Sequence, residues 1–240
     1  RKAAVEVSSD EAVEHQFPEA PASIQYETVT TQADLQRWIE KIEHAELTAL
    51  DTETTSLDPM MARLVGVSLS VKPGEACYIP VAHQGCEVIE QLSPAVVLAA
   101  LKPWLESSKH AKILHHAKYD AHVFATEGVR LQGIAEDSML QAYVLDSHLR
   151  VNMDDVAQRW LNVQTTPYES ICGKGAKQIA FADVSVDVAT AYACEDADIT
   201  LRLHQVMRPL IAAHEGLEAT YQLELATSSV LTTIEANGVA

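Results

Sequence analysis

Three short apolar runs, separated by turn-forming residues, set the strongest limit on how this chain can fold. They span residues 47–51, 64–71 and 76–81, and the connections between them contain Asp58-Pro59 and Lys72-Pro73-Gly74. Apolar runs of this length predict β-strands, and Pro, Gly and Asp favour the turns between them. Successive strands that are joined by turns rather than by a helix pair antiparallel. The sequence therefore predicts a three-stranded antiparallel meander.

Helix and strand patterns flank this meander on both sides. Before it we expect a strand at 24–29 and a helix that begins after the N-cap pattern Thr31-Gln32-Ala33-Asp34. A meander followed by alternating strand and helix resembles the layout of ribonuclease H-like domains, so the predicted fold class is α/β, a mixed β-sheet flanked by α-helices. The elements expected after the meander are a helix at 93–105, a strand at 112–115, and helices at 118–127, 137–145, 153–161, from 186 to beyond 204, and 217–236.

The charge of the chain restricts how it can meet nucleic acid. The formal net charge is −17 over 240 residues. Phosphate contacts depend on Lys and Arg, so this balance disfavours a protein that coats DNA or RNA. A nucleic-acid enzyme of this composition would hold only a few nucleotides at one end, with bound Mg²⁺ supplying local positive charge and another module supplying most of the affinity.

The sequence shows no sign of a membrane or secreted protein. None of its apolar runs approaches the roughly 18–20 residues that span a bilayer, and its N-terminal residues lack the pattern of a secretory signal. The four cysteines lie in apolar or helical patterns without CxxC spacing, as buried free thiols do: Cys77, Cys86, Cys172 and Cys194. We therefore expect a cytoplasmic protein without disulfides.

Acidic side chains stand at three places that could form one site. Asp51 and Glu53 close the first strand of the meander, where the two-residue period puts both on one face. Asp120 lies in the first turn of the helix that follows the next predicted strand. Tyr192 and Asp196 are four residues apart and share one face of a helix. Carboxylate oxygens are the ligands that Mg²⁺ and Mn²⁺ prefer.

Each of these features alone has a plainer explanation. An acidic strand end is most often a solvated turn, an Asp in a first helical turn can simply face the helix dipole, and a Tyr at helical spacing is usually core. The adjacent His115 and His116 do not complete a zinc site, because no Cys or further His stands at ligand spacing. The ordered set Asp-x-Glu, Asp and Tyr-x-x-x-Asp is much less expected by chance than any one member.

The same segments resemble the three motifs of the DEDD exonucleases, in the variant that has Tyr in the third motif. Residues 51–57 resemble the first motif, 118–120 the second and 192–198 the third. The closest resemblance is to the 3′→5′ exonuclease (proofreading) domain of bacterial family A DNA polymerases, and it extends from about Tyr26 to Val239. Further similar segments are 78–83, 159–161, 173–175 and 234–239.

The resemblance implies an enzyme that hydrolyses phosphodiesters at DNA 3′ ends and releases 5′-mononucleotides. It implies that Asp51, Glu53 and Asp196 hold one divalent ion. Asp51 and Asp120 would hold a second, with Mg²⁺ or Mn²⁺ expected and Zn²⁺ as an alternative at one site. Tyr192 is a poor base at neutral pH, since the ordinary pKa of Tyr is about 10, and we expect it to orient the attacking water.

Five further residues are expected to contact the substrate, by the same resemblance. Leu57 would lie against the terminal base, Tyr168 would stack near the end of the strand, and Arg150 would reach a phosphate. Tyr119 and His116 belong to the second motif, and His116 stands where the family usually has Asn. A core Leu, a surface Tyr and a solvated Arg are the plain alternatives for the first three.

The resemblance also divides the chain. Residues 1–22 would be a linker, 23–216 the exonuclease domain, and 217–240 a helix at the start of a truncated polymerase domain. We expect a monomer. Its expected partner is a single-stranded or frayed DNA 3′ end. A polymerase domain and an upstream 5′-nuclease domain are expected on the same chain. Two alternatives stay open: an exonuclease similar to ribonuclease D that trims RNA 3′ ends, and a catalytically silent domain that keeps only the fold.

Overall fold

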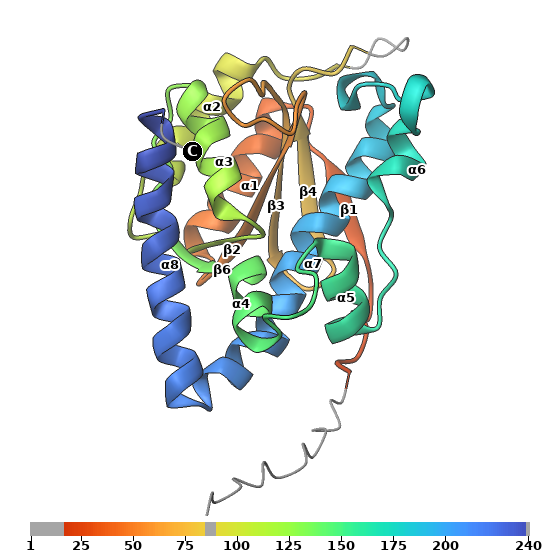
Figure 1. The fold of residues 1–240 in the computed structure, drawn as a ribbon. Coiled ribbons are helices and arrows are strands. Elements are labelled where there is room, and N and C mark those ends of the chain that lie inside the picture. The colour runs from red at the N-terminus through yellow and green to blue at the C-terminus, as the bar shows by residue number, and fades with distance from the viewer. Residues whose placement is uncertain (1–16, 85–89, 239–240) are drawn as a thin grey trace, which may run out of the picture.

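Six strands form one mixed β-sheet with helices on both faces (Figure 1). The computed structural model describes residues 17–84 and 90–238. In spatial order the strands are β1 (Gln25–Thr28), β4 (Glu75–Pro80), β3 (Leu64–Lys72), β2 (Thr48–Thr54), β5 (Lys112–Leu114) and β6 (Ile134–Asp137). The helices are α1 (Gln32–His44), α2 (Pro94–Leu105), α3 (Ala117–Thr126), α4 (Ser138–Leu145), α5 (Met153–Leu161), α6 (Tyr168–Cys172), α7 (Val186–Ala212) and α8 (Glu215–Ala236), with 3-10 turns η1 (Gly175–Lys177) and η2 (Phe181–Asp183).

The predicted antiparallel meander is confirmed. β2 pairs with β3, and β3 pairs with β4, both antiparallel. β1 is added parallel to β4, β5 parallel to β2, and β6 parallel to β5, so β3 alone runs against the other strands of this sheet. The predicted α/β class, a mixed sheet flanked by helices, is confirmed as well.

Two short elements, β6 and α6, differ from the sequence-based expectation. β6 reads Ile-Ala-Glu-Asp, a half-charged sequence without strand character, and it continues directly into α4. α6 has five residues, too few for a helical period to show. Two element boundaries also differ from the prediction. Strand β2 continues to Thr54, whereas the predicted strand ends at 51, and α8 begins at Glu215, two residues before the predicted start at 217.

One face of the sheet is covered by α1, α2 and α3. Leu50 of β2 and Leu69 of β3 pack there in a buried cluster with Trp38 of α1 and Trp104 of α2. Burial of a large apolar side chain contributes roughly 1.5–3 kcal/mol to folding. This cluster is therefore a major support of the sheet, and it lies away from the acidic motifs of α7.

The opposite face is covered by α7, whose buried residues include Ala189, Ala193 and Ala197. Small side chains let a helix approach a sheet closely, and α7 contacts β1, β2, β3 and β4. Asp198 fixes the helix along its axis, because its carboxylate accepts hydrogen bonds from the Tyr26 hydroxyl (3.0 Å) and from the Gly74 amide (2.7 Å).

α8 lies beside the sheet, where it packs against α3, α4 and α7 (Figure 1). Tyr221 of α8 is fully buried. Its hydroxyl donates to the Glu136 carboxylate at 2.7 Å and accepts from the Asp137 amide at 2.9 Å. These contacts attach α8 to the end of β6.

Other sequence-based expectations concern the termini, the thiols and the membrane. Cys77, Cys172 and Cys194 are buried free thiols, whereas Cys86 lies outside the described residues. Residues 17–22 of the expected linker contain neither helix nor strand, and its first 16 residues lie outside the described part. Among the helices of residues 17–84 and 90–238, none combines the length and the apolar composition needed to cross a membrane.

Candidate active site

Strand β2 turns two carboxylates toward α7. Ala49 packs with α7 on one side of the sheet, whereas Leu50 belongs to the core on the opposite side. Side chains alternate along a strand, so Asp51 and Glu53 share the side of Ala49. Because β2 continues to Thr54, both carboxylates lie within a hydrogen-bonded strand that fixes their spacing.

Helix α7 adds a third carboxylate. Tyr192 and Asp196 lie one turn apart on this helix, which the buried alanines bring close to β2. One carboxylate oxygen from each of Asp51, Glu53 and Asp196 lies within 4.8 Å of the other two. Three carboxylates at this separation form a set of oxygen ligands for a cation. The structure thus brings together residues from two segments that lie far apart in the sequence.

Asp120 approaches the same region from α3, on the other side of β2. It is 2% exposed, and its Oδ1 accepts a hydrogen bond from the Thr52 hydroxyl at 2.6 Å. Asp120 is not a member of the three-carboxylate cluster. Asp120 nevertheless interacts electrostatically with this cluster: burial raises its pKa most, and the charge of Asp51 raises it further.

Burial and mutual repulsion raise the pKa values of these carboxyl groups. Burial raises the pKa of Asp51 to about 7. Burial is also the largest cause of the raised pKa values of Glu53 and Asp196. The negative charges of Asp51 and Asp196 raise the pKa of Glu53 further. The charge of Asp51 does the same for Asp196. A divalent cation offsets both causes, since it replaces lost hydration and neutralises the repulsion. The donor set therefore fits a hard divalent cation such as Mg²⁺ or Mn²⁺.

The Tyr192 hydroxyl stays protonated at neutral pH. Burial is the largest cause that raises its pKa well above the ordinary value, followed by the charge of Asp196, to which it is also hydrogen-bonded. A hydroxyl in this state donates a hydrogen bond and is not a base. Its ring packs in a three-ring cluster with Phe181 and Tyr168, whose centroids lie 5.9 and 6.3 Å from its own.

Asp137 joins the start of α3 to the start of α4. Its carboxylate accepts hydrogen bonds from the amides of Ala117 (2.8 Å) and His116 (3.3 Å), and from those of Met139 (2.9 Å) and Leu140 (3.1 Å). Such bonds satisfy amides that the first turn of a helix leaves unpaired. Asp137 therefore fixes the helix that carries the fourth carboxylate. An Asp directly before an apolar helical pattern indicates an N-cap, so the sequence does indicate the contact of Asp137 with α4. The contact with α3 joins distant segments, and the local sequence does not indicate it.

His116 lies at the turn between β5 and α3 with φ 78° and ψ 52°, in the left-handed region. Most L-residues avoid this region, but Asn, Asp and His are enriched in it. The backbone thus explains why His can stand where the resemblance leads us to expect Asn. The His116 side chain is exposed, with its ring centroid 6.4 Å from that of Tyr119.

The carboxylate cluster opens into a space of about 730 Å³, which we name the carboxylate cavity. Leu57, 95% exposed, and Tyr168, 36% exposed, line it together with Tyr119. The Tyr119 hydroxyl is fixed by donation to the Ser56 carbonyl at 2.5 Å and by a hydrogen bond with Thr54. The described residues that line it are Asp51, Thr52, Glu53, Thr54, Thr55, Ser56, Leu57, Tyr119, Tyr168, Glu169, Gly173, Lys174, Gly175, Gln178, Tyr192 and Asp196.

Two of the five predicted substrate residues are not part of this lining. One is His116, and the other is Arg150, which is exposed and whose carbonyl accepts from Arg159 Nη2 at 3.2 Å. Conversely, Glu169, Lys174 and Gln178 line the cavity without having been predicted as site residues. The glycines around Lys174 indicate only a loop in the sequence, and nothing local shows which surface that loop faces.

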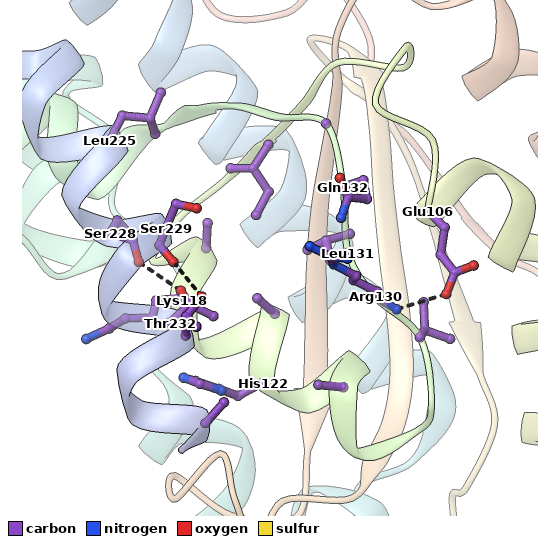
Figure 2. Close-up of a pocket in the computed structure, with 18 of the residues that line it drawn as sticks. Glu106, Lys118, His122, Arg130, Leu131, Gln132, Leu225, Ser228, Ser229 and Thr232 are labelled. Atoms are coloured by element: carbon purple, nitrogen blue, oxygen red, sulfur yellow. Dashed lines mark hydrogen bonds between the residues drawn. The ribbon is translucent and has the colours of Figure 1, made fainter. Parts of the chain in front are cut away.

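A second space of about 710 Å³ lies between α3, the segment 128–134 and α8, and we name it the α8 cavity (Figure 2). Beside it, the Glu235 carboxylate of α8 forms an ion pair with Lys118 and a hydrogen bond, at 2.9 Å, with His122 of α3. Figure 2 shows hydroxyl groups along the α8 wall, where Thr232 donates to the Ser228 carbonyl at 2.9 Å. Within the described part of the chain, its lining residues are Glu106, Ala117, Lys118, Ala121, His122, Ala125, Gly128, Val129, Arg130, Leu131, Gln132, Gly133, Ile134, Leu225, Ser228, Ser229, Thr232, Thr233, Ala236 and Asn237.

Comparison with protein families and sequences gives one consistent picture. A family model described as 3′-5′ exonuclease matches residues 26–212. DNA polymerase I of Pseudomonas aeruginosa is 46% identical over 234 residues, which cover 95% of this chain and 26% of that protein. The chain spans about a quarter of the length of the curated relatives it matches.

Solved structures share the fold at low identity. The POL domain of Pol1 from M. smegmatis, in complex with DNA primer-template and dNTP, superposes with a TM-score of 0.66 at 20% identity, covering 87% of this chain and 31% of that chain. Trypanosoma brucei RNase D superposes with a TM-score of 0.65 at 16% identity, covering 86% of this chain and 73% of that chain. At these identities the likeness supports the α/β fold alone.

Proposed function

This chain belongs to the 3′-5′ exonuclease family, and from that premise we propose that it removes nucleotides one at a time from DNA 3′ ends as 5′-mononucleotides. The observation that carries the proposal is the set of Asp51, Glu53 and Asp196, whose oxygens converge at the base of an open cavity. Hydrolysis of a phosphodiester needs an activated water and compensation of charge on the phosphate. A convergent carboxylate set in an accessible cavity suits that reaction.

DNA is favoured over RNA as the substrate. The sequence is 46% identical to a DNA polymerase I across almost the whole chain, whereas the likeness to an RNase D is 16% and concerns the fold. Editing of newly made DNA would also require a site that accepts any terminal base. The exposed Leu57 and Tyr168 supply apolar and aromatic surface, which contacts every base without reading its edge.

The carboxylates would hold two divalent ions. Asp51, Glu53 and Asp196 would hold the first, and Asp51 together with Asp120 the second, with Mg²⁺ or Mn²⁺ favoured by the all-oxygen donor set. When bound, such ions lower the pKa of water and offset charge on the phosphate. The Thr52 hydroxyl keeps Asp120 in place, and the strand keeps Asp51 beside Glu53.

Tyr192 would orient the attacking water. Its hydroxyl stays protonated and is hydrogen-bonded to Asp196. When a water enters, the hydroxyl would donate its one hydrogen bond to the water oxygen instead, and the Asp196 carboxylate would accept from the same water. The rings of Phe181 and Tyr168 keep the hydroxyl in a fixed direction. Tyr192 therefore acts by position, not by taking a proton.

The domain would work as the proofreading part of a longer polymerase. The chain matches about a quarter of the length of DNA polymerase I relatives, and we propose a covalently linked polymerase domain after α8 and a 5′-nuclease domain upstream. A chain at −17 repels DNA at long range, so its partners would supply most of the affinity. The isolated chain should therefore bind DNA weakly and only with metal present.

A digestion assay tests the proposed function. The purified chain is incubated with single-stranded DNA and RNA of the same sequence, labelled at the 5′ end, in Mg²⁺, in Mn²⁺ and in EDTA. We expect the DNA to shorten in single-nucleotide steps from its 3′ end, with no reaction in EDTA. Shortening of RNA alone would support an RNA-trimming enzyme instead. No hydrolysis of either strand with either ion would identify a catalytically silent domain.

A further inference from the structure

The carboxylate cavity holds a strong imbalance of charge. Among residues 17–84 and 90–238, four acidic side chains line it, from Asp51, Glu53, Glu169 and Asp196, and Lys174 is the one cationic residue in its lining. A nucleic-acid strand brings one negative charge per phosphate. Divalent ions at the carboxylates would compensate the scissile phosphate, but the next phosphate along the strand would still face acidic protein. A cation at the rim of the cavity is the residue that can meet it.

The loop that carries Lys174 is held at both ends. Gly173 ends α6 with φ 76°, and its amide donates to the Glu169 carbonyl at 3.0 Å. On the far side of the loop, the Ile179 amide donates to the Cys172 carbonyl at 2.8 Å. A Cβ at position 173 would lie 3.1 Å from the Lys177 carbonyl oxygen, so both the backbone angle and the space favour glycine there. These contacts hold the segment so that Lys174 is presented to the cavity.

In the free protein Lys174 forms an ion pair with Glu169. Both side chains are well exposed, at 76% and 52%, and an exposed pair of this kind contributes little to stability. Glu169 can therefore be exchanged for another anion at small cost. The pair also keeps the ammonium group at the cavity until a substrate arrives.

We propose that Lys174 binds a backbone phosphate on the 5′ side of the scissile bond, exchanging the Glu169 carboxylate for a phosphate oxygen. This inference rests on the proposed exonuclease function. Because the contact is to the backbone, it would not depend on the base. Because it lies away from the cleaved bond, it would strengthen substrate binding more than it accelerates the chemical step.

Steady-state kinetics on a short single-stranded DNA give the first measurement. Lys174→Gln should raise KM about tenfold with kcat nearly unchanged, and Lys174→Arg should retain a KM close to that of the wild type. Glu169→Gln, which frees the ammonium group, should lower KM by about twofold to fivefold. The matched control is Lys177→Gln, which removes a lysine of the same segment that does not line the cavity; its KM should stay within about twofold.

A substrate series locates the phosphate. Each linkage upstream of the scissile bond is replaced in turn by an uncharged methylphosphonate. One replacement should raise the KM of the wild type about tenfold and leave that of Lys174→Gln unchanged, because the variant has already lost the contact. Equal sensitivity of both proteins at every linkage would overturn the proposal.

Binding without turnover separates this inference from the proposed function. Fluorescence anisotropy with Ca²⁺ in place of Mg²⁺ gives the affinity for the same strand at several salt concentrations. Loss of one phosphate contact should reduce the slope of log K against log[salt] by about 0.7 for a single strand. An unchanged slope and KM in Lys174→Gln would refute the role of Lys174. If the salt slopes of the wild type and Lys174→Gln differ by this amount but the wild type does not hydrolyse DNA, the proposed function is refuted and the Lys174 contact still holds.

Discussion

Two cavities of nearly equal size lie on the two sides of α3, and their chemistry is opposite. The carboxylate cavity has a volume of about 730 Å³ and the α8 cavity about 710 Å³. In the first, carboxylates face one another and their pKa values are raised, first by burial and then by repulsion. Beside the second, the Glu235 carboxylate meets Lys118 and His122, and the hydrogen bond from Lys118 is the largest cause that lowers its pKa.

The difference teaches that size does not identify a site. Like charges that a fold forces together are a source of binding energy for a cation, whereas opposite charges that already meet are satisfied within the protein. Helix α3 belongs to both regions: Asp120 and Tyr119 lie on the carboxylate side, and Lys118 and His122 on the α8 side. The comparison predicts that changes on the first side alter catalysis and changes on the second alter stability.

The largest effect is expected from removal of a carboxylate. Asp51→Ala should lower the rate of DNA hydrolysis by about 10³- to 10⁵-fold, because the loss of a metal ligand removes several kcal/mol of stabilisation from the transition state. Single-turnover rates at saturating Mg²⁺ measure it. Arg130→Gln is the matched control, since it removes a charge that lines the α8 cavity, and it should change the rate by less than about twofold.

Thermal melting checks that this loss is chemical. Mg²⁺ should raise the melting temperature of the wild type, since a ligand at 100 times its Kd stabilises a protein by about 2.7 kcal/mol. It should leave the melting temperature of Asp51→Ala unchanged. Equal losses of rate in Asp51→Ala and Arg130→Gln would contradict the prediction that only the carboxylate cavity takes part in catalysis.

A smaller effect on the rate is expected from Tyr192→Phe. If the hydroxyl orients water, its removal costs one hydrogen bond of about 1–3 kcal/mol, or roughly 5- to 150-fold in rate. The Mg²⁺ dependence of the melting temperature should stay as in the wild type, because no ligand is lost. A defect as deep as that of Asp51→Ala, with metal binding intact, would show that Tyr192 is indispensable to the chemical step.

The stability of the metal-free protein should depend on the charge of Asp51. Its pKa is raised to about 7 from the ordinary 3.8, so the folded state holds a proton that the unfolded state releases between these values. Stability in EDTA therefore falls as pH rises from about 4 to 7. Asp51→Asn lacks this loss and should be more stable than the wild type at pH 8 by up to about 4 kcal/mol, since one pKa unit corresponds to about 1.4 kcal/mol, with no gain near pH 4. Urea unfolding at both pH values measures it, and a variant less stable than the wild type at pH 8 would contradict the cost of burying the charged Asp51 carboxylate.

The sequence predicts those parts of the fold and site that depend on local periods. A two-residue period places Asp51 and Glu53 on one face, and a four-residue spacing pairs Tyr192 with Asp196. The meander follows from apolar runs and turns. β6 is missed because half of its four residues are charged and its hydrogen bonds come from β5, a partner that the local sequence does not reveal.

Contacts between distant segments are the part that the sequence does not provide. Nothing local shows that Thr52 binds Asp120 or that the loop of Lys174 faces the carboxylates. Arg150 was expected at the substrate from resemblance alone, and the structure places its side chain outside the carboxylate cavity lining. Loops carry weak periodic signals, so their residues can be assigned to a surface only after the core is packed.

The smallest effect concerns Glu235, whose pKa is lowered from the ordinary 4.5 by hydrogen bonds first from Lys118 and then from His122. A depressed carboxyl pKa contributes stability above about pH 4.5, and that contribution is lost as pH falls through the folded-state value. The Glu235 side chain is 25% exposed, so solvent screening limits the loss in Glu235→Gln to about 0.5–1 kcal/mol at pH 7, and the loss should shrink as pH falls below 4.5. Glu224→Gln, on the same helix, is the control for removal of an acidic charge. Urea unfolding of the wild type, Glu235→Gln, Lys118→Met and the double variant gives the coupling energy between Glu235 and Lys118. The single-turnover rate of Glu235→Gln should stay within about twofold of the wild type. A stability loss that grows toward acid pH would contradict the lowered pKa of Glu235. A single-turnover rate that falls by more than about twofold would show that α8 takes part in catalysis through α3 and that the two cavities are not independent.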